Sequence, residues 1–362
     1  DTFTRDNLPA QEEWPELTFE LPELQYPPQL NCAVELVDKQ VQSGNGDRVA
    51  IRGKDDTWTY RQLQEKVNRI ANYLVSEIGV VPGNRILLRF PNSPLFAACY
   101  LAVLKCGAVA IPTMPLLRES ELSVIVAKAR AKFAICDARL IDAVQNLPLE
   151  RLISSDESLE GMELASTDYA AVETASDDVA LIAFTSGTTG KPKGCMHFHR
   201  DVMSMCHTVS THVLKPTPDD VFIGSPPLAF TFGLGGLLAF PLHAGASTIL
   251  LEAAPPPVLA DARQSMGATI SFTAPTAYKV MLSDEHVGKV SGLRIAVSAG
   301  EHLPKPVYLE WMEKTGVPMI DGLGATEMIH IFLSTTGRND KPGSTGVPTA
   351  GYEVRVVDDD LN

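Results

Sequence analysis

The residues best suited to binding a charged ligand directly follow an apolar stretch, residues 179–184. Residues 184–194 read Phe-Thr-Ser-Gly-Thr-Thr-Gly-Lys-Pro-Lys-Gly. The glycines leave backbone amides accessible, and the hydroxyl and ammonium groups around them add donors and positive charge. Because each donor can face a charged oxygen, the segment predicts a triphosphate-binding loop. Its binding residues are Thr185, Ser186, Gly187, Thr188, Thr189, Gly190 and Lys193.

The loop does not have the spacing of a Walker A motif. In that motif four residues separate the two glycines, whereas here two residues separate Gly187 from Gly190, and Pro192 follows Lys191. This spacing disfavours a P-loop kinase or ATPase. The remaining alternative is an ordinary surface loop rich in small residues, and the strand that ends directly in this run argues against it.

The composition restricts the classes of partner. The 362 residues include 44 acidic and 30 basic side chains, a formal net charge of −14, which disfavours nucleic acid and anionic membranes as partners. A membrane span is not expected, because apolar runs stay shorter than about 18 residues. The six cysteines form no Cys-x-x-Cys pair and the acidic, proline-rich start does not resemble a signal peptide, so we expect reduced thiols and a cytoplasmic location. Nothing in the sequence indicates an oligomeric state.

Two later segments join the loop in a pattern that resembles the adenylate-forming superfamily. This superfamily comprises acyl- and aryl-CoA ligases, peptide-synthetase adenylation domains and firefly-type luciferases. The segments are Ser-Ala-Gly-Glu at 298–301 and Asp-Gly-Leu-Gly-Ala-Thr-Glu at 321–327. Together with shorter matches at 58–63 and 104–112, the resemblance extends over about 45–360.

The resemblance assigns roles to these segments. It implies that Thr185, Lys193, Thr326 and Glu327 are catalytic, with Thr326 at the α-phosphate and Glu327 holding Mg²⁺. Taken alone, Glu327 could equally be a solvated helix residue. The remaining nucleotide-binding residues are Gly300, Glu301, His302, Asp321, Gly322, Leu323 and Gly324.

The reaction implied by the resemblance uses ATP, Mg²⁺ and coenzyme A. A carboxylate attacks the α-phosphorus of ATP to give an acyl-adenylate and pyrophosphate, and the CoA thiol then forms a thioester. This chemistry needs positioning and charge neutralisation more than acid–base groups. Amides, hydroxyls and lysine suffice for it.

An aromatic acid is the substrate class that the pocket segments favour. Residues 227–236 read Pro-Leu-Ala-Phe-Thr-Phe-Gly-Leu-Gly-Gly, without the Asp that would pair with an α-amino acid's ammonium group. The run 327–332 resembles benzoate- and 2-aminobenzoate-CoA ligases, in which the His lines the aryl pocket. We favour 2-aminobenzoate, with benzoate as the alternative, while His330 could also be a satisfied core histidine. The substrate set is Ala229, Phe230, Gly235, Ala299, Gly324, His330 and Ile331.

Alternating strands and helices must position these residues. Apolar runs at 49–51, 85–88, 108–112, 132–136, 179–184, 247–251, 269–272 and 293–297 predict strands, and Thr59 caps a helix through 62–74. Continuous apolar strands between helices indicate parallel sheets covered on both faces. We expect an α/β fold with an extended arm (1–44), two flavodoxin-like subdomains (45–175 and 176–340) and the start of a β-barrel subdomain (341–362). Period-two alternation at 352–357 predicts an antiparallel strand.

Two further expectations concern what the sequence lacks. The ribose-binding Asp, the hinge and the C-terminal domain with its catalytic Lys, which the superfamily has further along, are not found in this sequence. The resemblance therefore leaves open an adenylation domain that loads a carrier protein, or a fragment that only binds. The imidazoles of His197 and His199 could pass for a metal pair, but a third ligand at suitable spacing is missing.

Overall fold

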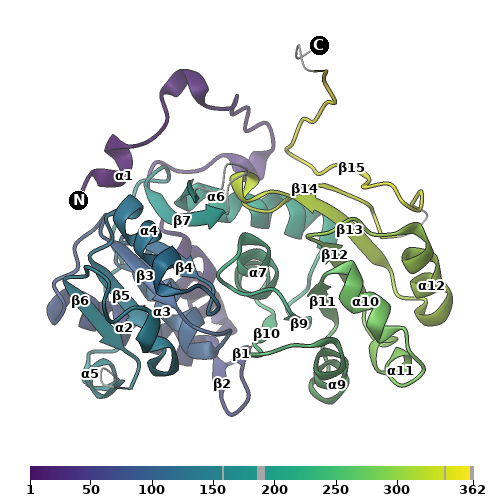
Figure 1. The fold of residues 1–362 in the computed structure, drawn as a ribbon, viewed down its shortest axis with the longest axis horizontal. Helices are drawn as coiled ribbons and strands as arrows, with labels where there is room; N and C mark the ends of the chain where they lie inside the picture. The colour runs from purple at the N-terminus through teal and green to yellow at the C-terminus, as the bar shows by residue number, and fades with distance from the viewer. Residues whose placement is uncertain (157–158, 186–191, 338–339, 359–362) are drawn as a thin grey trace.

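A computed structural model describes residues 1–156, 159–185, 192–337 and 340–358. Two mixed sheets lie side by side, the first at the left and the second at the right of Figure 1, with α7 (Thr231–Leu234) between them. Helices pack on the sheets, as the apolar strand pattern predicts. None of the helices in these ranges is long and apolar enough to cross a membrane.

The first sheet has six strands. Their order is β6 (Arg151–Ser154), β5 (Phe133–Cys136), β3 (Arg85–Arg89), β4 (Val109–Thr113), β7 (Val179–Thr185) and β8 (Lys193–Phe198). The first five run parallel, and β8 returns antiparallel to β7. On one face Ile86 and Leu88 pack with α2 (Tyr60–Ser76) and α3 (Pro94–Lys105). On the other face Leu87 packs with α4 (Glu119–Ala129).

The second sheet has nine strands. Their order is β15 (Val347–Pro348), β14 (Ile331–Ser334), β13 (Met319–Gly324), β12 (Ile295–Ala299), β11 (Ile270–Thr273), β9 (Val221–Gly224), β10 (Ser247–Ile249), β1 (Val49–Arg52) and β2 (Thr57–Thr59). The strands from β13 to β1 are parallel, and both edges carry antiparallel strands. One face is covered by α9 (Pro256–Met266), α10 (Pro275–Met281), α11 (Val287–Val290) and α12 (Lys305–Thr315), with Trp311 at the centre.

The opposite face of the second sheet shares one core with the first sheet. This core joins α3 to Phe272 of β11 and to η7 (Gly235–Ala239) and α8 (Phe240–His243). The site residues therefore lie on two sheets that pack as one body.

The helix α2 begins with the predicted capping box. The Thr59 hydroxyl accepts a hydrogen bond from the Gln62 amide, and the Gln62 side chain accepts one from the Thr59 amide.

Sheet membership does not follow the expected division at 175/176. β1 and β2, from the first half of the chain, complete the second sheet, while β7 and β8 complete the first. Two α/β sheets are confirmed, whereas the predicted residue boundaries of the subdomains remain a prediction. Periodicity reports whether a segment is a strand and not which strand it pairs with.

Two local expectations differ from the structure. The predicted strand at 352–357 is wrong: residues 352–358 form no strand, and Val356 is almost fully exposed. Alternation alone cannot hold a strand when no neighbouring strand supplies ladder hydrogen bonds. The arm is not extended throughout, since η3 (Val34–Asp38) and η4 (Val41–Asn45) are helical and Leu36 and Val37 are buried in the shared core.

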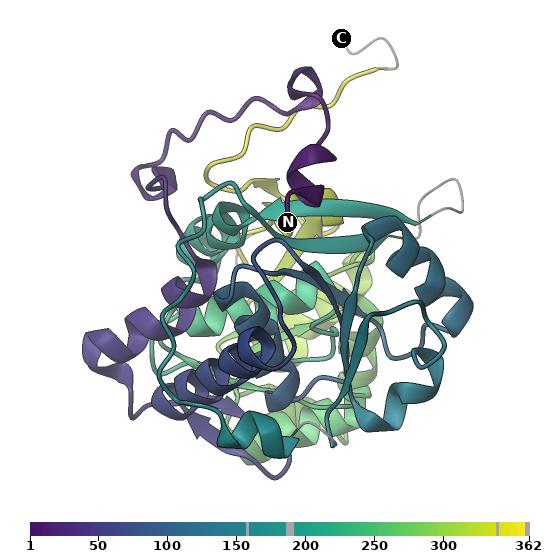
Figure 2. The ribbon, with the colours of Figure 1, turned by 90° about the vertical axis from the view of Figure 1, so that its left-hand side faces the viewer.

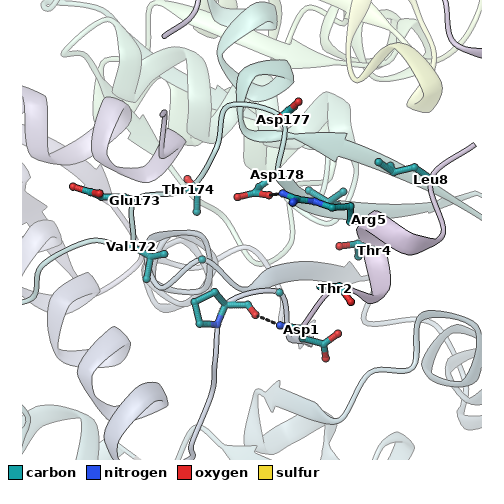
Figure 3. Close-up of a pocket in the computed structure, with 14 residues that line it drawn as sticks. Asp1, Thr2, Thr4, Arg5, Leu8, Val172, Glu173, Thr174, Asp177 and Asp178 are labelled. Atoms are coloured by element: carbon teal, nitrogen blue, oxygen red, sulfur yellow. Dashed lines mark hydrogen bonds and ion pairs between the residues drawn. The ribbon is translucent and has the colours of Figure 1, made fainter. Parts of the chain in front are cut away.

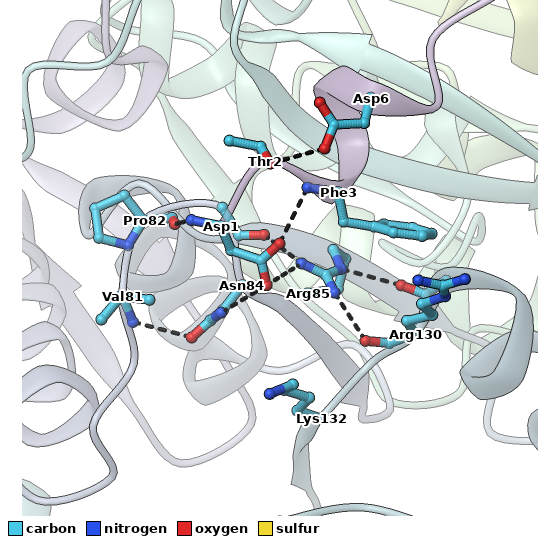
Figure 4. Close-up of polar contacts among 12 residues, drawn as sticks. Asp1, Thr2, Phe3, Asp6, Val81, Pro82, Asn84, Arg85, Arg130 and Lys132 are labelled. Atoms are coloured by element: carbon cyan, nitrogen blue, oxygen red, sulfur yellow. Dashed lines mark hydrogen bonds and ion pairs between the residues drawn. The ribbon is translucent and has the colours of Figure 1, made fainter.

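The arm lies over the ends of both sheets, in purple in Figures 1 and 2. Its first helix, α1 (Phe3–Asp6), and the loop before β7 enclose a cavity of about 280 Å³, which the ion pair between Arg5 and Asp178 (2.6 Å) borders (Figure 3). The ring of Phe3 lies 4.7 Å from the Arg85 guanidinium and 5.0 Å from that of Arg130 (Figure 4). Cation–π contacts of this kind fix the arm on the first sheet.

Candidate functional site

The hairpin of β7 and β8 carries the two ends of the predicted phosphate loop. Thr185, the last residue of β7, pairs with Lys193, the first residue of β8. Ser186, Gly187, Thr188, Thr189 and Gly190 lie outside the described residues. The structure thus places Thr185 and Lys193 opposite one another where the loop leaves and rejoins the sheet, with Lys193 exposed.

One face of β8 is turned toward the second sheet. Side chains alternate along a strand, so Lys193, Cys195 and His197 share a face, while Met196 and Phe198 pack into the core of the first sheet. The imidazole Nε2 of His197 lies 2.7 Å from the carbonyl oxygen of Thr326. Sequence reasoning considered this histidine only as a metal ligand. Alternation of polar residues at 193, 195 and 197 was the signal that could have placed it in the site.

Glu327 lies within electrostatic reach of the same face. Burial is the main cause that raises the pKa of the Cys195 thiol, to about 11, and the negative charge of Glu327 raises it further while Lys193 opposes the rise. Thr326 is half-buried and Glu327 exposed, in the short turn η8 (Thr326–Met328) that follows β13. The structure therefore gathers Thr185, Lys193, Thr326 and Glu327 at the junction of the two sheets.

The two later segments predicted to bind the nucleotide, 298–301 and 321–327, lie side by side. β12 and β13 pair in parallel, with Ala299 opposite Gly322 and Ser298 opposite Asp321. Both strands end at the same edge of the sheet, the edge where open α/β sheets bind ligands. Beyond β12 the exposed residues are Gly300, whose φ is +88°, Glu301 and His302, and beside them Leu323 and Gly324 are exposed at the end of β13.

Asp321 is 7% exposed and is therefore less accessible than Leu323 and Gly324, which end the same strand. Burial raises the pKa of its carboxyl to about 6, with the charge of His302 acting in the opposite direction. Its backbone amide donates to the Thr335 hydroxyl at 2.8 Å, and its carbonyl accepts from the Thr335 amide at 2.9 Å. Asp321 is thus anchored in the sheet, and the groups that a nucleotide can reach are its exposed neighbours.

The turn of Thr326 and Glu327 leads into a compact apolar cluster around His330. The imidazole is 2% exposed and lies 4.7 Å from the ring of Phe240 and 5.6 Å from that of Phe232. Its Nε2 is 3.4 Å from the Phe232 carbonyl oxygen, and Nδ1 is buried without a hydrogen-bond partner among the residues that the structure describes. Burial lowers the pKa of His330 to about 3, so the ring is neutral at physiological pH.

Two glycines allow this close packing. A methyl group at Gly235 would lie 2.6 Å from Nε2 of His330, and one at Gly324 would lie 2.8 Å from the His330 carbonyl oxygen. Ile331 pairs with Gly324 and packs its side chain against Gly322. The structure therefore brings together four members of the predicted substrate set, Gly235, Gly324, His330 and Ile331, with Ala299 one strand away.

The other two members precede α7. Ala229 is buried, whereas Phe230, at the N-cap of α7, exposes 47% of its surface. Their segment is held from the first sheet by Asn92, whose side-chain amide donates to the Pro226 carbonyl at 2.9 Å and accepts from the Leu228 amide at 2.7 Å. Sequence reasoning missed Asn92, because no local pattern links residue 92 to residue 226.

Neither of two cavities in the structure is lined by a predicted site residue. One is the cavity under the arm, and the other, of about 300 Å³, lies beside Trp58 and Lys66. The predicted residues that lie close together, and not a cavity, therefore locate the site.

His199 does not join His197 in a metal pair, since its Nδ1 lies 3.1 Å from the Cys32 sulfur. Among the residues that the structure describes, no group of three His, Cys, Asp or Glu could hold a metal ion.

Comparisons with known proteins agree with this geometry. The chain is 30% identical to a benzoate–CoA ligase of Thauera aromatica over 94% of this chain and 67% of the relative. It is 31% identical to a 3-hydroxybenzoate–CoA ligase of an Aromatoleum species over 91% and 66%. The crystal structure of an anthranilate CoA ligase in complex with anthranoyl-AMP superposes with a TM-score of 0.89 at 30% identity, over 94% of this chain and 68% of that one.

The chain spans about two thirds of the length of these relatives. The family model described as AMP-binding enzyme matches residues 37–362, which include every residue of the gathered site. The resemblance drawn from the three signatures is confirmed, and the chain belongs to the family of AMP-binding enzymes.

Proposed function

We propose that this chain binds ATP and an aromatic carboxylic acid, and that the complete protein converts the acid to an acyl-adenylate and then to a CoA thioester. One observation carries the proposal: the polar groups of Lys193, Thr326 and Glu327 lie on β8 and on the turn that leads directly into the buried His330. A charged nucleotide and an apolar ring would therefore bind as neighbours. The three relatives named above are each called a CoA ligase for an aromatic acid, which supports the same class of substrate.

The nucleotide side of the site has groups suited to charge neutralisation. Lys193 and the hydroxyls of Thr185 and Thr326 would face the phosphates, where they stabilise the charge that develops at the α-phosphorus. Glu327 fits Mg²⁺, because this ion is commonly held by one or two carboxylates together with phosphate oxygens. When bound, the ion would offset phosphate charge, and Glu327 would keep it beside Lys193.

The residues proposed to bind the carboxylic acid favour an aromatic ring that carries a hydrogen-bond donor ortho to the carboxylate. Nδ1 of His330 is a buried polar atom with no hydrogen-bond partner in the described part of the chain, and such atoms cost about 1–3 kcal/mol when they stay unpaired. A neutral imidazole can accept a hydrogen bond from the amino group of 2-aminobenzoate, whereas benzoate offers it none. We therefore favour 2-aminobenzoate over benzoate, with Phe232 and Phe240 supplying the apolar walls.

The second candidate function is loading of an aryl acid onto a carrier protein, and the third is binding without catalysis. Both agree with the nucleotide and acid residues, since carrier-protein loading differs from the CoA ligase only in what accepts the acyl group, and a binding function needs only the two ligand sites. This chain covers about two thirds of the length of its relatives, so we propose the transfer of the acyl group for the complete protein and not for this chain alone. Six free thiols, five of them buried, fit the cytoplasm as the proposed location.

A thermal unfolding screen tests the substrate class. The chain is heated with ATP and Mg²⁺ together with benzoate, 2-aminobenzoate, 2-hydroxybenzoate or a fatty acid. A ligand at 100 times its Kd stabilises the folded state by about 2.7 kcal/mol, which gives a clear rise in Tm. We expect the largest rise with 2-aminobenzoate. A response to the fatty acid alone would overturn the aryl pocket.

Mass spectrometry tests the acceptor. A longer form of the protein, incubated with 2-aminobenzoate, ATP, Mg²⁺ and CoA, should produce the CoA thioester. Acyl-adenylate without thioester would favour the carrier-protein function. Pyrophosphate exchange by the 362-residue chain and by the longer form shows what the additional length contributes, and equal rates would contradict our expectation that it supplies a catalytic lysine.

A further inference from the structure

A hydrogen bond crosses between the two sheets inside the site. His197 belongs to β8 at the edge of the first sheet, and its Nε2 lies 2.7 Å from the carbonyl oxygen of Thr326, which follows β13 of the second sheet. The imidazole is 4% exposed, so water does not compete for this bond. The strand that carries Lys193 is thereby attached to the turn that carries Glu327.

The direction of this bond is fixed by its acceptor. A carbonyl oxygen can only accept, so Nε2 carries the proton and Nδ1 is the unprotonated nitrogen of the ring. Nδ1 faces Asp201 at 3.9 Å, and that carboxylate already accepts from the Phe198 amide at 2.8 Å. Burial lowers the pKa of His197 to about 4, which keeps the ring neutral with a single N–H. The only proton of the ring is therefore directed at Thr326.

The turn at Thr326 has few constraints of its own. It is one turn long, no side chain caps its start, and it ends at Ile329 with φ of +60°. Within the turn, the Thr326 carbonyl accepts from the Ile329 amide at 3.1 Å. His197 is a second donor to the same oxygen and comes from the opposite sheet. The peptide that joins Thr326 to Glu327 is therefore held at a fixed distance from β8.

We propose that His197 is a positioning residue of the nucleotide site, which holds the turn of Thr326 and Glu327 against β8 and so aligns the Glu327 carboxylate with Lys193. This inference rests on the proposed function, because it needs a nucleotide above Lys193. It assigns His197 no contact with substrate. Its effect is to fix the separation between the group proposed to hold Mg²⁺ and the strand that ends the loop.

Three variants separate positioning from packing. His197→Leu keeps an apolar side chain of similar size but removes the donor, and His197→Gln restores an N–H at a similar distance along the side chain. His199→Leu is the matched control, since His199 is equally buried two residues away and its Nδ1 faces Cys32 of the N-terminal segment. Titration calorimetry of the 362-residue chain then measures Kd for ATP with Mg²⁺, for ATP with EDTA, and for 2-aminobenzoate.

We expect His197→Leu to weaken binding of ATP with Mg²⁺ about tenfold, the loss that follows from one hydrogen bond. The loss with EDTA should be smaller, and binding of 2-aminobenzoate should change less than twofold. His197→Gln should return the Kd to within about threefold of wild type, while His199→Leu should lower Tm without changing the Kd for nucleotide.

Other outcomes overturn the inference in distinguishable ways. If wild type binds ATP and His197→Leu binds it equally well, the positioning role is wrong and the proposed function stands. Equal losses in His197→Leu and His199→Leu would show a packing effect, which also removes the positioning role. A wild-type chain that binds neither ATP nor an aryl acid would overturn the proposed function and the inference together.

Discussion

The imidazole of His330 lies against the backbone of Gly235 so closely that a methyl group at residue 235 would be 2.6 Å from its Nε2. Real Cβ contacts are not this short, so any larger residue at 235 must displace the ring from the pocket. We expect Gly235→Ala to weaken 2-aminobenzoate binding at least tenfold and to leave nucleotide binding within about twofold. Calorimetric Kd values for both ligands check this expectation. Gly288→Ala, in α11, is the matched control and should change neither Kd, because beyond its own helix and chain neighbours no described atom lies within 4 Å of the added methyl group.

His330→Leu tests the proposed discrimination between the two acids. Leucine fills a similar volume among Phe232 and Phe240 but offers no acceptor to an ortho amino group. The variant should bind 2-aminobenzoate about tenfold more weakly, which corresponds to about 1.4 kcal/mol, and benzoate as well as wild type does. Competition calorimetry with both acids gives the ratio. Equal losses for both acids would show that His330 only packs.

The buried ion pair of Lys105 and Asp38 should be costly to break on one side. Lys105 is 2% exposed and donates to the Asp38 carboxylate and to the Asn68 side chain, both at 2.6 Å. Lys105→Met leaves a buried carboxylate without its cation, which costs about 3–5 kcal/mol. Urea unfolding should show this loss, and the double variant with Asp38→Asn should recover most of it. Lys39→Met, which breaks an exposed pair with Glu35, should cost less than about 1 kcal/mol. A loss as small as this one in Lys105→Met would contradict the argument.

Acid should destabilise the fold between about pH 6.5 and pH 4. Burial lowers the pKa of four histidines, to about 4 or to about 3, so the unfolded chain takes up protons at these residues in a range where the folded chain does not. They are His197, His199, His243 and His330. Their stabilising contribution is present above the unfolded pKa of about 6.5 and is lost as pH falls toward the folded values.

Two aspartates act in the opposite direction. Burial raises the pKa of Asp201 and Asp321 to about 6, so the folded state binds their protons more tightly and gains stability as pH falls through that value. Four histidines outweigh two aspartates, and Tm should therefore fall from pH 7 to pH 5. Calorimetric scans across this range measure the change, and a constant or rising Tm would mean that the histidines are solvated in the folded chain.

The sequence predicted helices and strands correctly where their residue pattern repeats within one segment. The helix after Thr59 and the apolar strands were correct because their spacing and caps are contained in about fifteen residues or fewer. The three signatures predicted which segments meet at the site, and β12 and β13 do lie together. The strand at 352–357 failed because a period of two describes a surface but supplies no partner strand.

Contacts between distant segments could not be predicted in the same way. Nothing near residue 197 indicates that its proton goes to residue 326, and nothing near Asn92 indicates the loop at 226–228. Such contacts depend on how the sheets pack, which is settled only when the whole core forms. The polar residues that hold the site from a distance were therefore missed, while the residues of the family signatures were predicted from their own segments and remain a prediction.

The pairing of β1 with β10 has a consequence for synthesis on the ribosome. Ile51 lies beside Thr248, so β1 leaves the exit tunnel roughly 200 residues before its partner strand exists. At elongation rates of about 5–20 residues per second, that interval lasts on the order of ten seconds or more. During it β1 can pair with β2, but its other side, which faces β10 in the folded chain, must stay unpaired or be shielded by a chaperone. Cleavage after residue 175 would leave the second sheet without its β1 and β2 edge. The two sheets therefore have to fold as a single unit.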